Sequence, residues 1–224
     1  MASLQISERN RCAFVHIPKT GGTSVERSAL FADVRCGGHT GVQDFLKVLG
    51  ARRTEFYLFT FVRNPWDRLV SAFEYMSRGG GTGGDKAISD EYLRRFNGNF
   101  GEFVEALTEE PDLLNLEHFR PQIKYVENDQ GYVEVDYIGR FERLSSDFDQ
   151  ICARVGCQGT RLQHLRTKGH NLGVRVGIRL LNQLGVPTRK VFRRDYRKWF
   201  TDRTVILTAQ TYERDATAFG YTFE

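Results

Sequence analysis

A short apolar run that stops at a proline and a pair of glycines constrains this chain most. Residues 13–17 predict a buried strand, Pro18 ends it, and the glycines at 21–22 allow a tight turn. Residues 23–26, Thr-Ser-Val-Glu, have the pattern of a capping box and predict the start of a helix. The free N–H groups and the positive dipole end of such a helix, together with Lys19 in the turn, form a cradle for an anion such as phosphate.

The turn differs from the nucleotide-triphosphate loop G-x-x-x-x-G-K-[ST]. Its lysine precedes the glycines, and Gly-Lys-Ser/Thr occurs nowhere in the chain. Because strand-to-helix turns without a ligand also contain glycine, the turn alone leaves a purely structural role open. Residues 79–84 are rich in glycine too, but no apolar strand precedes them, and we expect a flexible loop there.

The length of the chain fits one domain over residues 1–224. Its 40% apolar and 27% charged residues are ordinary for a soluble globular protein. No apolar run approaches the roughly 18 residues of a membrane span, and the N-terminus lacks a basic-then-apolar pattern. We therefore expect no membrane anchor, a cytoplasmic location, and reduced thiols at the four cysteines, which have no zinc-like spacing.

Positive charge gathers near the C-terminus. Residues 161–203 contain twelve lysines and arginines but only two acids, although the net charge of the whole chain is +4. This asymmetry indicates either an anionic ligand or a solvated basic helix face. We expect no nucleic-acid partner, because no helix-turn-helix, zinc-finger or aromatic RNA-binding signature accompanies the charge.

Apolar patterns along the rest of the chain predict alternating strands and helices. Residues 56–62 are apolar almost throughout and should form a strand in a sheet that is covered on both faces. Weaker strand patterns lie at 33–36, 132–135 and 137–139. Helices are expected near 24–31, 42–49, 65–76, 89–97, 100–109, 148–155, 188–199 and 203–217. The helix after the central strand should have Asn64 as its N-cap and Pro65 as its first residue. The alternation predicts an α/β fold with a mainly parallel sheet, and residues 156–187 a loop-rich segment.

Two blocks of the sequence are more specific than a general α/β pattern. Residues 18–24, Pro-Lys-Thr-Gly-Gly-Thr-Ser, resemble the 5′-phosphosulfate loop of sulfotransferases that use 3′-phosphoadenosine 5′-phosphosulfate (PAPS). Residues 61–73, which read FVRNPWDRLVSAF, resemble the 3′-phosphate motif of the same family. The resemblance is strongest to the branch that includes carbohydrate 2-O- and 4-O-sulfotransferases and bacterial relatives. Weaker similarity continues through residues 118–122, 137–142 and 212–221.

This resemblance implies a P-loop-like, nucleotide-kinase-like fold of three α/β/α layers with a helical C-terminal part. It implies transfer of a sulfuryl group from PAPS to an acceptor hydroxyl on a glycan or small molecule, with 3′-phosphoadenosine 5′-phosphate (PAP) as product and no metal. The acceptor, the sulfated position and the oligomeric state stay open.

The donor has anionic groups at two ends, so a protein that binds it needs two cationic cradles. The resemblance assigns the 5′ end to Lys19, Thr20, Gly21, Gly22, Thr23 and Ser24, and the 3′-phosphate to Arg63 and Ser71. Ser71 lies about two turns beyond Arg63, roughly 10 Å along a helix, and a guanidinium can still meet its hydroxyl at one phosphate. The alternatives are an ion pair for Arg63 and an unremarkable hydroxyl for Ser71. Fixed positive charge and positioning should supply most of the catalysis, with Lys19 stabilising the leaving group.

The acceptor hydroxyl needs a base, and His39 is our first candidate. It follows the strand expected at 33–36, at the sheet edge where ligands bind in such folds. In the sulfotransferases that the chain resembles, a histidine in a comparable turn is the base. His118 is the second candidate, whereas His16 lies inside the first strand and is expected to be structural.

The acceptor cleft is the expected place of His118, Arg120 and Gln122, although Pro121 could simply shape a turn. Residues 166–170 contain cationic side chains that could close over the nucleotide: Arg166, Lys168 and His170. Two other functions remain open at this stage. A triphosphate kinase or hydrolase lacks its loop and its acidic strand end here, and a non-catalytic nucleotide- or glycan-binding module is the third possibility.

Overall fold

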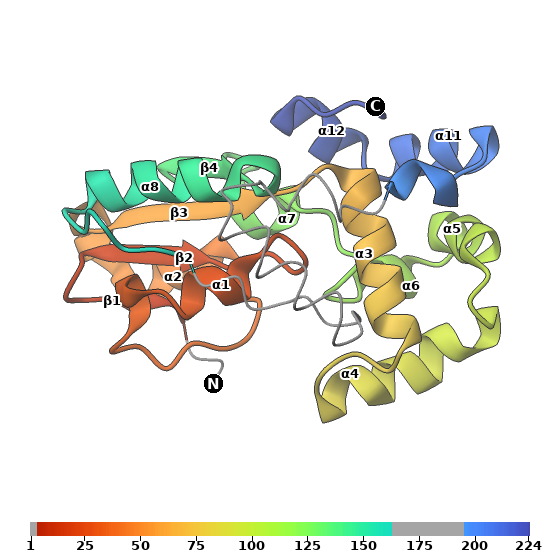
Figure 1. Ribbon diagram of the computed structural model, residues 1–224, viewed down its shortest axis with the longest axis horizontal. Coiled ribbons are helices and arrows are strands. Elements are labelled where there is room, and N and C mark those ends of the chain that lie inside the picture. Colours follow the sequence, from red (N-terminus) through yellow and green to blue (C-terminus); the bar gives the residue numbers. More distant parts are fainter. Residues whose placement is uncertain (1–3, 163–194) are drawn as a thin grey trace, which may run out of the picture.

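A four-stranded sheet at the centre of the fold is parallel except at one edge (Figure 1). The computed structural model describes residues 4–162 and 195–224. The strands lie in the order of the sequence: β1 (Ile6–Ser7), β2 (Cys12–Val15), β3 (Tyr57–Val62) and β4 (Tyr137–Arg140). β1 is antiparallel to β2, whereas β2, β3 and β4 run parallel.

Helices of very different lengths surround the sheet and extend the fold beyond one of its ends. They are α1 (Gly22–Glu26), α2 (Val42–Leu49), α3 (Pro65–Ser77), α4 (Gly83–Ile88), α5 (Phe100–Glu109), α6 (Pro111–Asn115), α7 (Ile123–Val126), α8 (Leu144–Arg154), α11 (Asp202–Thr211) and α12 (Glu213–Phe219). Short 3-10 turns occur at Ala29–Phe31, Gly50–Glu55, Arg94–Phe96, Phe141–Arg143 and Tyr196–Trp199, and a π-helical turn at Ser89–Leu93.

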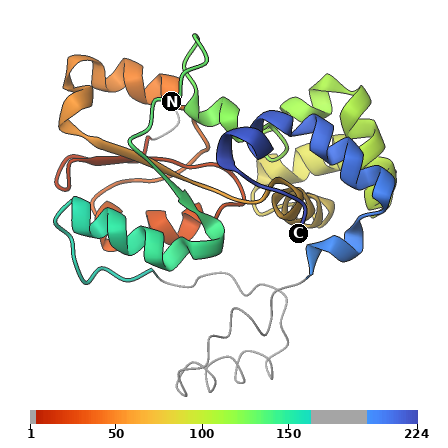
Figure 2. The ribbon, with the colours of Figure 1, turned by 90° about the horizontal axis from the view of Figure 1, so that it is seen from above.

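Both faces of the sheet are buried because successive side chains of a strand point to opposite sides. Phe14 and Phe59 pack with Phe148 of α8 on one face. Ala13 and Leu58, the residues next to them, belong to the core cluster of the other face, which α2 and α7 complete. Figure 2 shows α2 on one side of the sheet and α1 and α8 on the other. The expected three-layer α/β/α arrangement with a mainly parallel sheet is therefore confirmed.

A second core lies among the helices beyond the sheet, on the right of Figure 1. α3 leads from the end of β3 into this core, where Phe73 packs between Phe100 and Phe103 of α5. The indole N–H of Trp66 donates to the carbonyl of Val205 in α11 at 3.2 Å. α3 thus connects the sheet with the helical part, and its first turn lies where the two cores meet.

The central strand and the helix after it follow the prediction. β3 is buried along almost its whole length. The Asn64 side chain accepts hydrogen bonds from the amides of Trp66 and Asp67, and Pro65 is the first helical residue. This local sequence therefore specifies both the end of the strand and the direction of α3.

The strand predicted at residues 33–36 is wrong, because the segment has no sheet partner. Val34 and Cys36 are partly buried and pack against the core on one face of the sheet. The position beside β2 is taken instead by β1, whose Ile6 pairs with Ala13. The pattern of apolar side chains was real, but burial rather than strand pairing explains it.

Two predictions about helix starts are also wrong. α1 begins at Gly22 with Gly21 as its N-cap, in the left-handed region with φ 90°, and no side chain caps it, so the capping box at residues 23–26 does not form. Conversely, α4 begins inside the glycine-rich run at 79–84, because Thr82 and Asp85 form a capping box. The start of α1 is therefore set by a backbone conformation that glycine adopts easily, and the start of α4 by its side-chain cap.

In the rest of the described chain, the predicted secondary structure is confirmed only in part. An isolated bridge between Glu127 and Val133 closes the turn before β4, but residues 132–135 form no strand. In α11 the buried side is partly polar, since Ile206 is 57% exposed while Thr204 and Thr208 are buried. Residues 163–194 lie outside the described part, and with them Arg166, Lys168, His170 and most of the basic segment 161–203. None of the helices in the described ranges is long and apolar enough to span a bilayer.

Candidate active site

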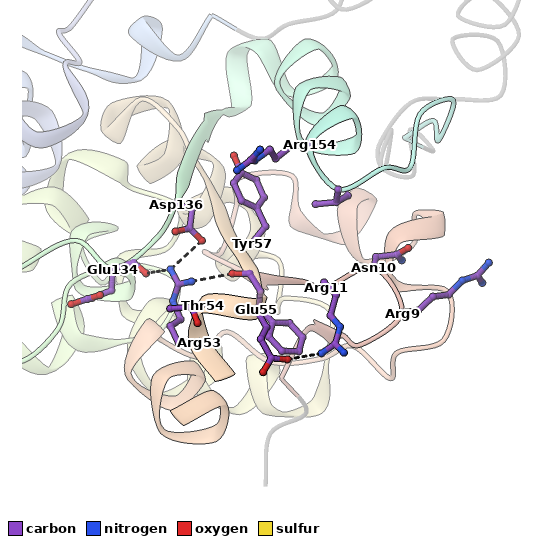
Figure 3. Close-up of a pocket in the computed structure, with 12 residues that line it drawn as sticks. Arg9, Asn10, Arg11, Arg53, Thr54, Glu55, Tyr57, Glu134, Asp136 and Arg154 are labelled. Atoms are coloured by element: carbon purple, nitrogen blue, oxygen red, sulfur yellow. Dashed lines mark hydrogen bonds and ion pairs between the residues drawn. The ribbon is translucent and has the colours of Figure 1, made fainter. Parts of the chain in front are cut away.

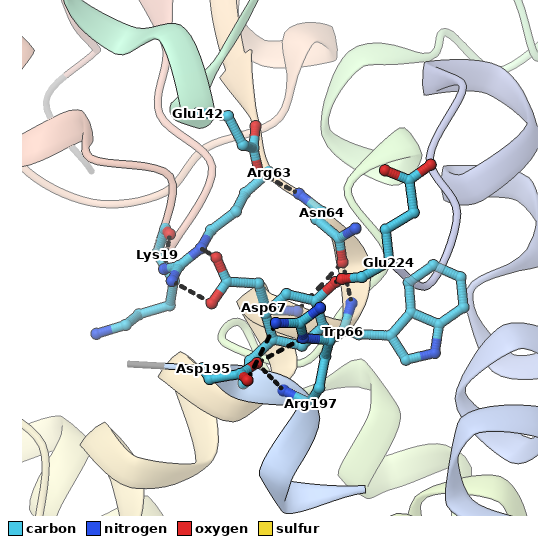
Figure 4. Close-up of polar contacts among 10 residues, drawn as sticks. Lys19, Arg63, Asn64, Trp66, Asp67, Glu142, Asp195, Arg197 and Glu224 are labelled. Carbon is cyan, nitrogen blue, oxygen red and sulfur yellow. Dashed lines mark hydrogen bonds and ion pairs between the residues drawn. The ribbon is translucent and has the colours of Figure 1, made fainter. Parts of the chain in front are cut away.

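The two sequence motifs meet at the carboxyl ends of the parallel strands β2 and β3. Open α/β sheets bind ligands outside this edge. Lys19 follows β2 and Arg63 follows β3, and Nη1 of Arg63 donates to the main-chain carbonyl of Lys19 at 3.0 Å (Figure 4). The segments predicted to hold the two ends of one donor are therefore in direct contact.

The Arg63 guanidinium is held on three sides. Its Nε and Nη2 donate to the two carboxylate oxygens of Asp67 at 3.0 and 2.8 Å, and its Cζ lies 4.3 Å from the centroid of the Phe141 ring. Only 13% of the Arg63 side chain is exposed. The ion pair that the sequence left open thus exists, and it fixes the guanidinium beside the Lys19 turn.

Gln122 was predicted to line the acceptor cleft, but its side chain is fully buried. Its Oε1 accepts from the Arg63 amide at 2.9 Å, and its Nε2 donates to the Arg63 carbonyl at 2.8 Å. The main-chain amides of Gln122 and Ile123 donate to the buried carboxylate of Asp215. Gln122 therefore fixes the main chain of Arg63 at the end of β3.

The turn after β2 has an unusual backbone. Lys19 has φ 71° and Gly21 has φ 90°, both in the left-handed region. The buried Thr20 hydroxyl donates to the carbonyl of Ile17 at 2.8 Å, so it closes the turn from inside. Thr23 and Ser24 follow in α1 with partly exposed side chains, and the Ser24 amide donates to the Gly21 carbonyl at 3.0 Å. The predicted loop residues form one turn, and Thr20 and the Ser24 amide already have partners within it.

Gly22 is required because the His16 ring packs directly against its Cα. A Cβ at this position would lie 2.1 Å from Cδ2 of the ring. His16 is buried, and its Nδ1 lies 2.8 Å from Oε1 of Glu26 in α1. The pair ties the end of β2 to α1, which agrees with the structural role predicted for His16.

Arg68, which the sequence patterns did not single out, connects α3 to the turn. It is 1% exposed, and its Nε donates to the carbonyl of Pro18 at 3.0 Å while its Nη2 donates to that of His118 at 3.3 Å. A buried arginine has no local sequence signature, because its partners lie 50 residues away in each direction. Arg68 thus sets the distance between the Lys19 turn and His118.

Three histidines form a row beside the turn. The ring centroids of His16 and His39 are 4.3 Å apart, and those of His39 and His118 are 5.9 Å apart. The His118 ring in turn stacks on Tyr75 of α3 at 5.2 Å. We expected His39 to follow the end of a strand, but it reaches this position from an irregular segment.

Burial keeps two of these histidines neutral. Burial, followed by the neighbouring His16 and His118, lowers the pKa of His39 from 6.5 to about 2. Burial also lowers the pKa of His118, to about 4, with Lys19 and Arg68 acting in the same direction and Asp85 against it. Nδ1 of His39 is buried without a hydrogen-bond partner. Both imidazoles are therefore uncharged near pH 7, the form that can accept a proton.

Ser71 and Arg120 are the remaining predicted site residues. Ser71 is partly buried in α3 four residues after Asp67, so the two side chains lie on the same face of the helix. Arg120 donates to the carbonyl of Asn115 at 3.1 Å, and its guanidinium lies 5.7 Å from the centroid of the Tyr125 ring. Ser71 thus belongs to the face of α3 that contacts Arg63, while Arg120 follows His118.

Two cavities lie at opposite ends of the strands. One of about 740 Å³ is lined by Arg11, Arg53 and Tyr57 at the amino ends of β2 and β3 (Figure 3). The other, of about 640 Å³, is lined by residues that include Asn64 and Glu142 at the carboxyl ends. Of these two cavities, the second borders the Arg63 segment, because Asn64 directly follows Arg63. The amide of Asn64 also donates to Glu142 at 2.9 Å. Within the described residues, no group of three or more His, Cys, Asp or Glu side chains is arranged to bind a metal ion.

Comparisons with known proteins identify the family of the chain. The model of the family described as "Sulfotransferase family" matches residues 3–222. Carbohydrate sulfotransferase 14 of Danio rerio is 33% identical over 130 residues, which cover 51% of this chain and 33% of that protein. An uncharacterized protein of Archaeoglobus fulgidus is 28% identical over 101 residues, 45% of this chain and 68% of that protein. The chain thus spans about a third of the length of the Danio rerio relative, and no solved structure gives a significant match.

Proposed function

Because the chain belongs to the sulfotransferase family, we propose that it transfers a sulfuryl group from PAPS to an acceptor hydroxyl, and that a carbohydrate carries this hydroxyl. The observation that supports the donor best is the 3.0 Å contact between the Arg63 guanidinium and the Lys19 carbonyl. It brings two cationic segments, 44 residues apart in the sequence, to one edge of the sheet. A donor with anionic groups at both ends needs this arrangement.

The residues at the site fit such a donor. Lys19 and the turn up to Ser24 would bind its 5′ end, and Arg63 with Ser71 its 3′-phosphate. The contacts of Arg63 with Asp67 and Lys19 use three of its five N–H groups, so two stay available for a phosphate. The mixed anhydride of PAPS supplies an activated sulfuryl group whose leaving phosphate is stable.

The chemistry then needs a fixed positive charge and a base. The Lys19 ammonium would stabilise the negative charge that develops on the leaving oxygen. The neutral His39 would take the proton of the acceptor hydroxyl while the acceptor oxygen forms a bond to sulfur and the sulfur–phosphate oxygen bond breaks. Anionic groups of a bound donor would raise the pKa of His39 from its low value and make it a stronger base.

The carbohydrate acceptor is supported by the name of the Danio rerio relative and by the branch of the family that residues 61–73 resemble. His118 and Arg120 are our candidates for acceptor contacts, whereas Gln122 would act through Arg63. Cytoplasmic location and independence from metal stay predictions from the sequence. A non-catalytic module that binds nucleotide or glycan is the alternative, and the three histidines beside Lys19 favour the enzyme.

The test is incubation with radiolabelled PAPS and a panel of glycans and small alcohols, for wild type and two lysine variants. Lys19→Ala should abolish transfer but keep much of its affinity for PAP, which Arg63 still binds. Lys47→Ala is the matched control, because the side chain of Lys47 on α2 is 75% exposed. Transfer by Lys19→Ala at the rate of wild type would contradict the mechanism. Tight binding of PAP by wild type without transfer to any acceptor would favour the binding module.

The base assignment has its own variant. His39→Ala should lose turnover while it still binds PAP, since His39 does not contact the donor-binding segments in our proposal. Unchanged turnover in His39→Ala would move the role of base to His118.

A further inference from the structure

The ammonium group of Lys19 lies over the face of an aromatic ring. Its Nζ is 3.9 Å from the centroid of Tyr75, well inside the roughly 6 Å range of a cation–π interaction. Tyr75 lies on the same face of α3 as Asp67 and Ser71, because the three residues are spaced four apart. Lys19 thus makes two contacts with this part of the chain: its carbonyl accepts from Arg63, two residues before α3, and its side chain lies on Tyr75 within α3.

The Tyr75 ring is itself fixed through its hydroxyl. This hydroxyl donates to Oδ2 of Asp85 at 2.7 Å, and the same oxygen accepts from the amides of Gly81 and Thr82, each at 3.1 Å. Burial acts to raise the pKa of Asp85, but the hydrogen bonds from Tyr75, the Gly81 amide and Thr82 outweigh it and leave the pKa below its usual value. Asp85 is therefore a carboxylate at neutral pH and a constant acceptor for the tyrosine.

The glycine-rich run gains a physical reason from this arrangement. A Cβ at Gly81 would lie 2.6 Å from the Tyr75 hydroxyl oxygen, and a Cβ at Gly80 would lie 2.1 Å from Cβ of Asp85. Gly80 also has φ 66°, in the left-handed region. The proposed function gives the run at 79–84 no role. Its glycines leave the space that the Asp85 carboxylate needs to reach the Tyr75 hydroxyl.

We propose that Tyr75 is a positioning residue for Lys19, and that Asp85 and the glycine-rich turn fix the Tyr75 ring for this purpose. The catalytic part of this inference rests on the proposed function, in which the Lys19 ammonium stabilises the leaving group. The ring restricts the long lysine side chain to one region beside the histidine row, because Tyr75 also stacks on His118. Less side-chain freedom is then lost when the ammonium acts in the transition state.

The contact can be tested without activity, by NMR of protein labelled with 13C-lysine. The chain contains seven lysines, and the Lys19→Arg variant assigns the signal of Lys19. The ε-methylene protons of Lys19 should be shifted upfield by the ring current in wild type, less so in Tyr75→Phe, whose ring lacks the hydrogen bond to Asp85, and should return to the ordinary position in Tyr75→Leu. An unshifted Lys19 signal in wild type, or the same signal in Tyr75→Leu as in wild type, would overturn the proposal.

Kinetics then separate positioning from folding. A cation–π interaction of ordinary strength predicts that Tyr75→Leu lowers kcat by roughly 2- to 30-fold, with a smaller change in KM for PAPS. Tyr75→Phe, which keeps the ring but loses its hydrogen bond to Asp85, should lower kcat less than Tyr75→Leu. Tyr132→Leu is the matched control, because Tyr132 is 69% exposed. Asp85→Ala keeps the Tyr75 ring but removes the acceptor of the Tyr75 hydroxyl, and it should reduce both kcat and the upfield shift. This variant tests the proposal if Tyr75→Leu does not fold.

The outcomes distinguish this proposal from the function on which it rests. A ring-current shift in wild type without any sulfuryl transfer would refute the proposed function and keep the Lys19–Tyr75 contact. Transfer by wild type together with an unchanged kcat in a folded Tyr75→Leu would refute the positioning role alone.

Discussion

The neutral histidines at the site predict that the protein loses stability as the pH falls from 7 to 5. An unfolded chain protonates His39 and His118 near pH 6.5, whereas their folded pKa values are about 2 and about 4. Between pH 6.5 and 5 the unfolded state therefore binds two protons that the folded state does not. Stability rises with pH wherever the unfolded state binds more protons, so it must fall on acidification.

The size of this effect follows from the width of the pH window. Each histidine contributes about 1.4 kcal/mol per pH unit over the roughly 1.5 units between pH 6.5 and 5, hence about 2 kcal/mol each and about 4 kcal/mol together. Because both folded pKa values lie below 5, the figure depends on the window and hardly on their exact positions. A loss of this size is a large fraction of the roughly 5–15 kcal/mol by which domains are stable.

Urea denaturation at pH 7 and pH 5 measures the effect, with the double variant His39→Gln/His118→Gln as reference. Wild type should lose about 4 kcal/mol more than the double variant between these two pH values. Subtraction removes the contributions of Asp215 and Glu117, whose pKa values burial raises and which act in the opposite direction in both proteins. Equal pH dependence of the two proteins would refute the neutral histidine pair.

Three further predictions concern single positions. Gly22→Ala should cost roughly 1–3 kcal/mol of stability by thermal denaturation, because its Cβ would overlap the His16 ring. Gly83→Ala is the control, since a Cβ at Gly83 meets nothing within 4 Å. Equal stability of the two variants would contradict the packing of His16 on Gly22. Asn64→Ala should cost about 1 kcal/mol in urea denaturation through the loss of two capping bonds, and no loss would mean that the cap is dispensable. The pH profile of kcat/KM of wild type should show no acid limb from His39 above pH 5, so an acid limb with a midpoint near 6.5 would contradict its low pKa.

The parts of the fold that the sequence predicts are those with strong local signals. Residues 56–62 are apolar almost throughout, and Asn64 followed by Pro65 is a helix start that needs no distant partner. The strand expected at 33–36 shows the opposite case, since its pairing depends on which segment occupies the edge of β2, and β1 occupies it. β1 has only two paired residues, so no periodicity could indicate it.

The site was predictable to the extent that contiguous motifs carry it. The contact of Lys19 with Arg63 follows from two motifs at neighbouring strand ends. Tyr75 and Arg68 were missed, because a ring under a lysine and a buried guanidinium are defined by partners far away in the sequence. The T-x-x-D pattern of Thr82 and Asp85 was present and would have indicated that α4 begins within the glycine-rich run.

The central claim is that Lys19 and Arg63 bind the two ends of one nucleotide, and calorimetry with two nucleotides tests it most directly. Wild type should bind adenosine 3′,5′-bisphosphate more tightly than adenosine 5′-monophosphate, which lacks the 3′-phosphate. Arg63→Ala should abolish this preference, whereas Lys19→Ala should keep it. A preference for the bisphosphate that survives in Arg63→Ala, or its absence in wild type, would contradict the account.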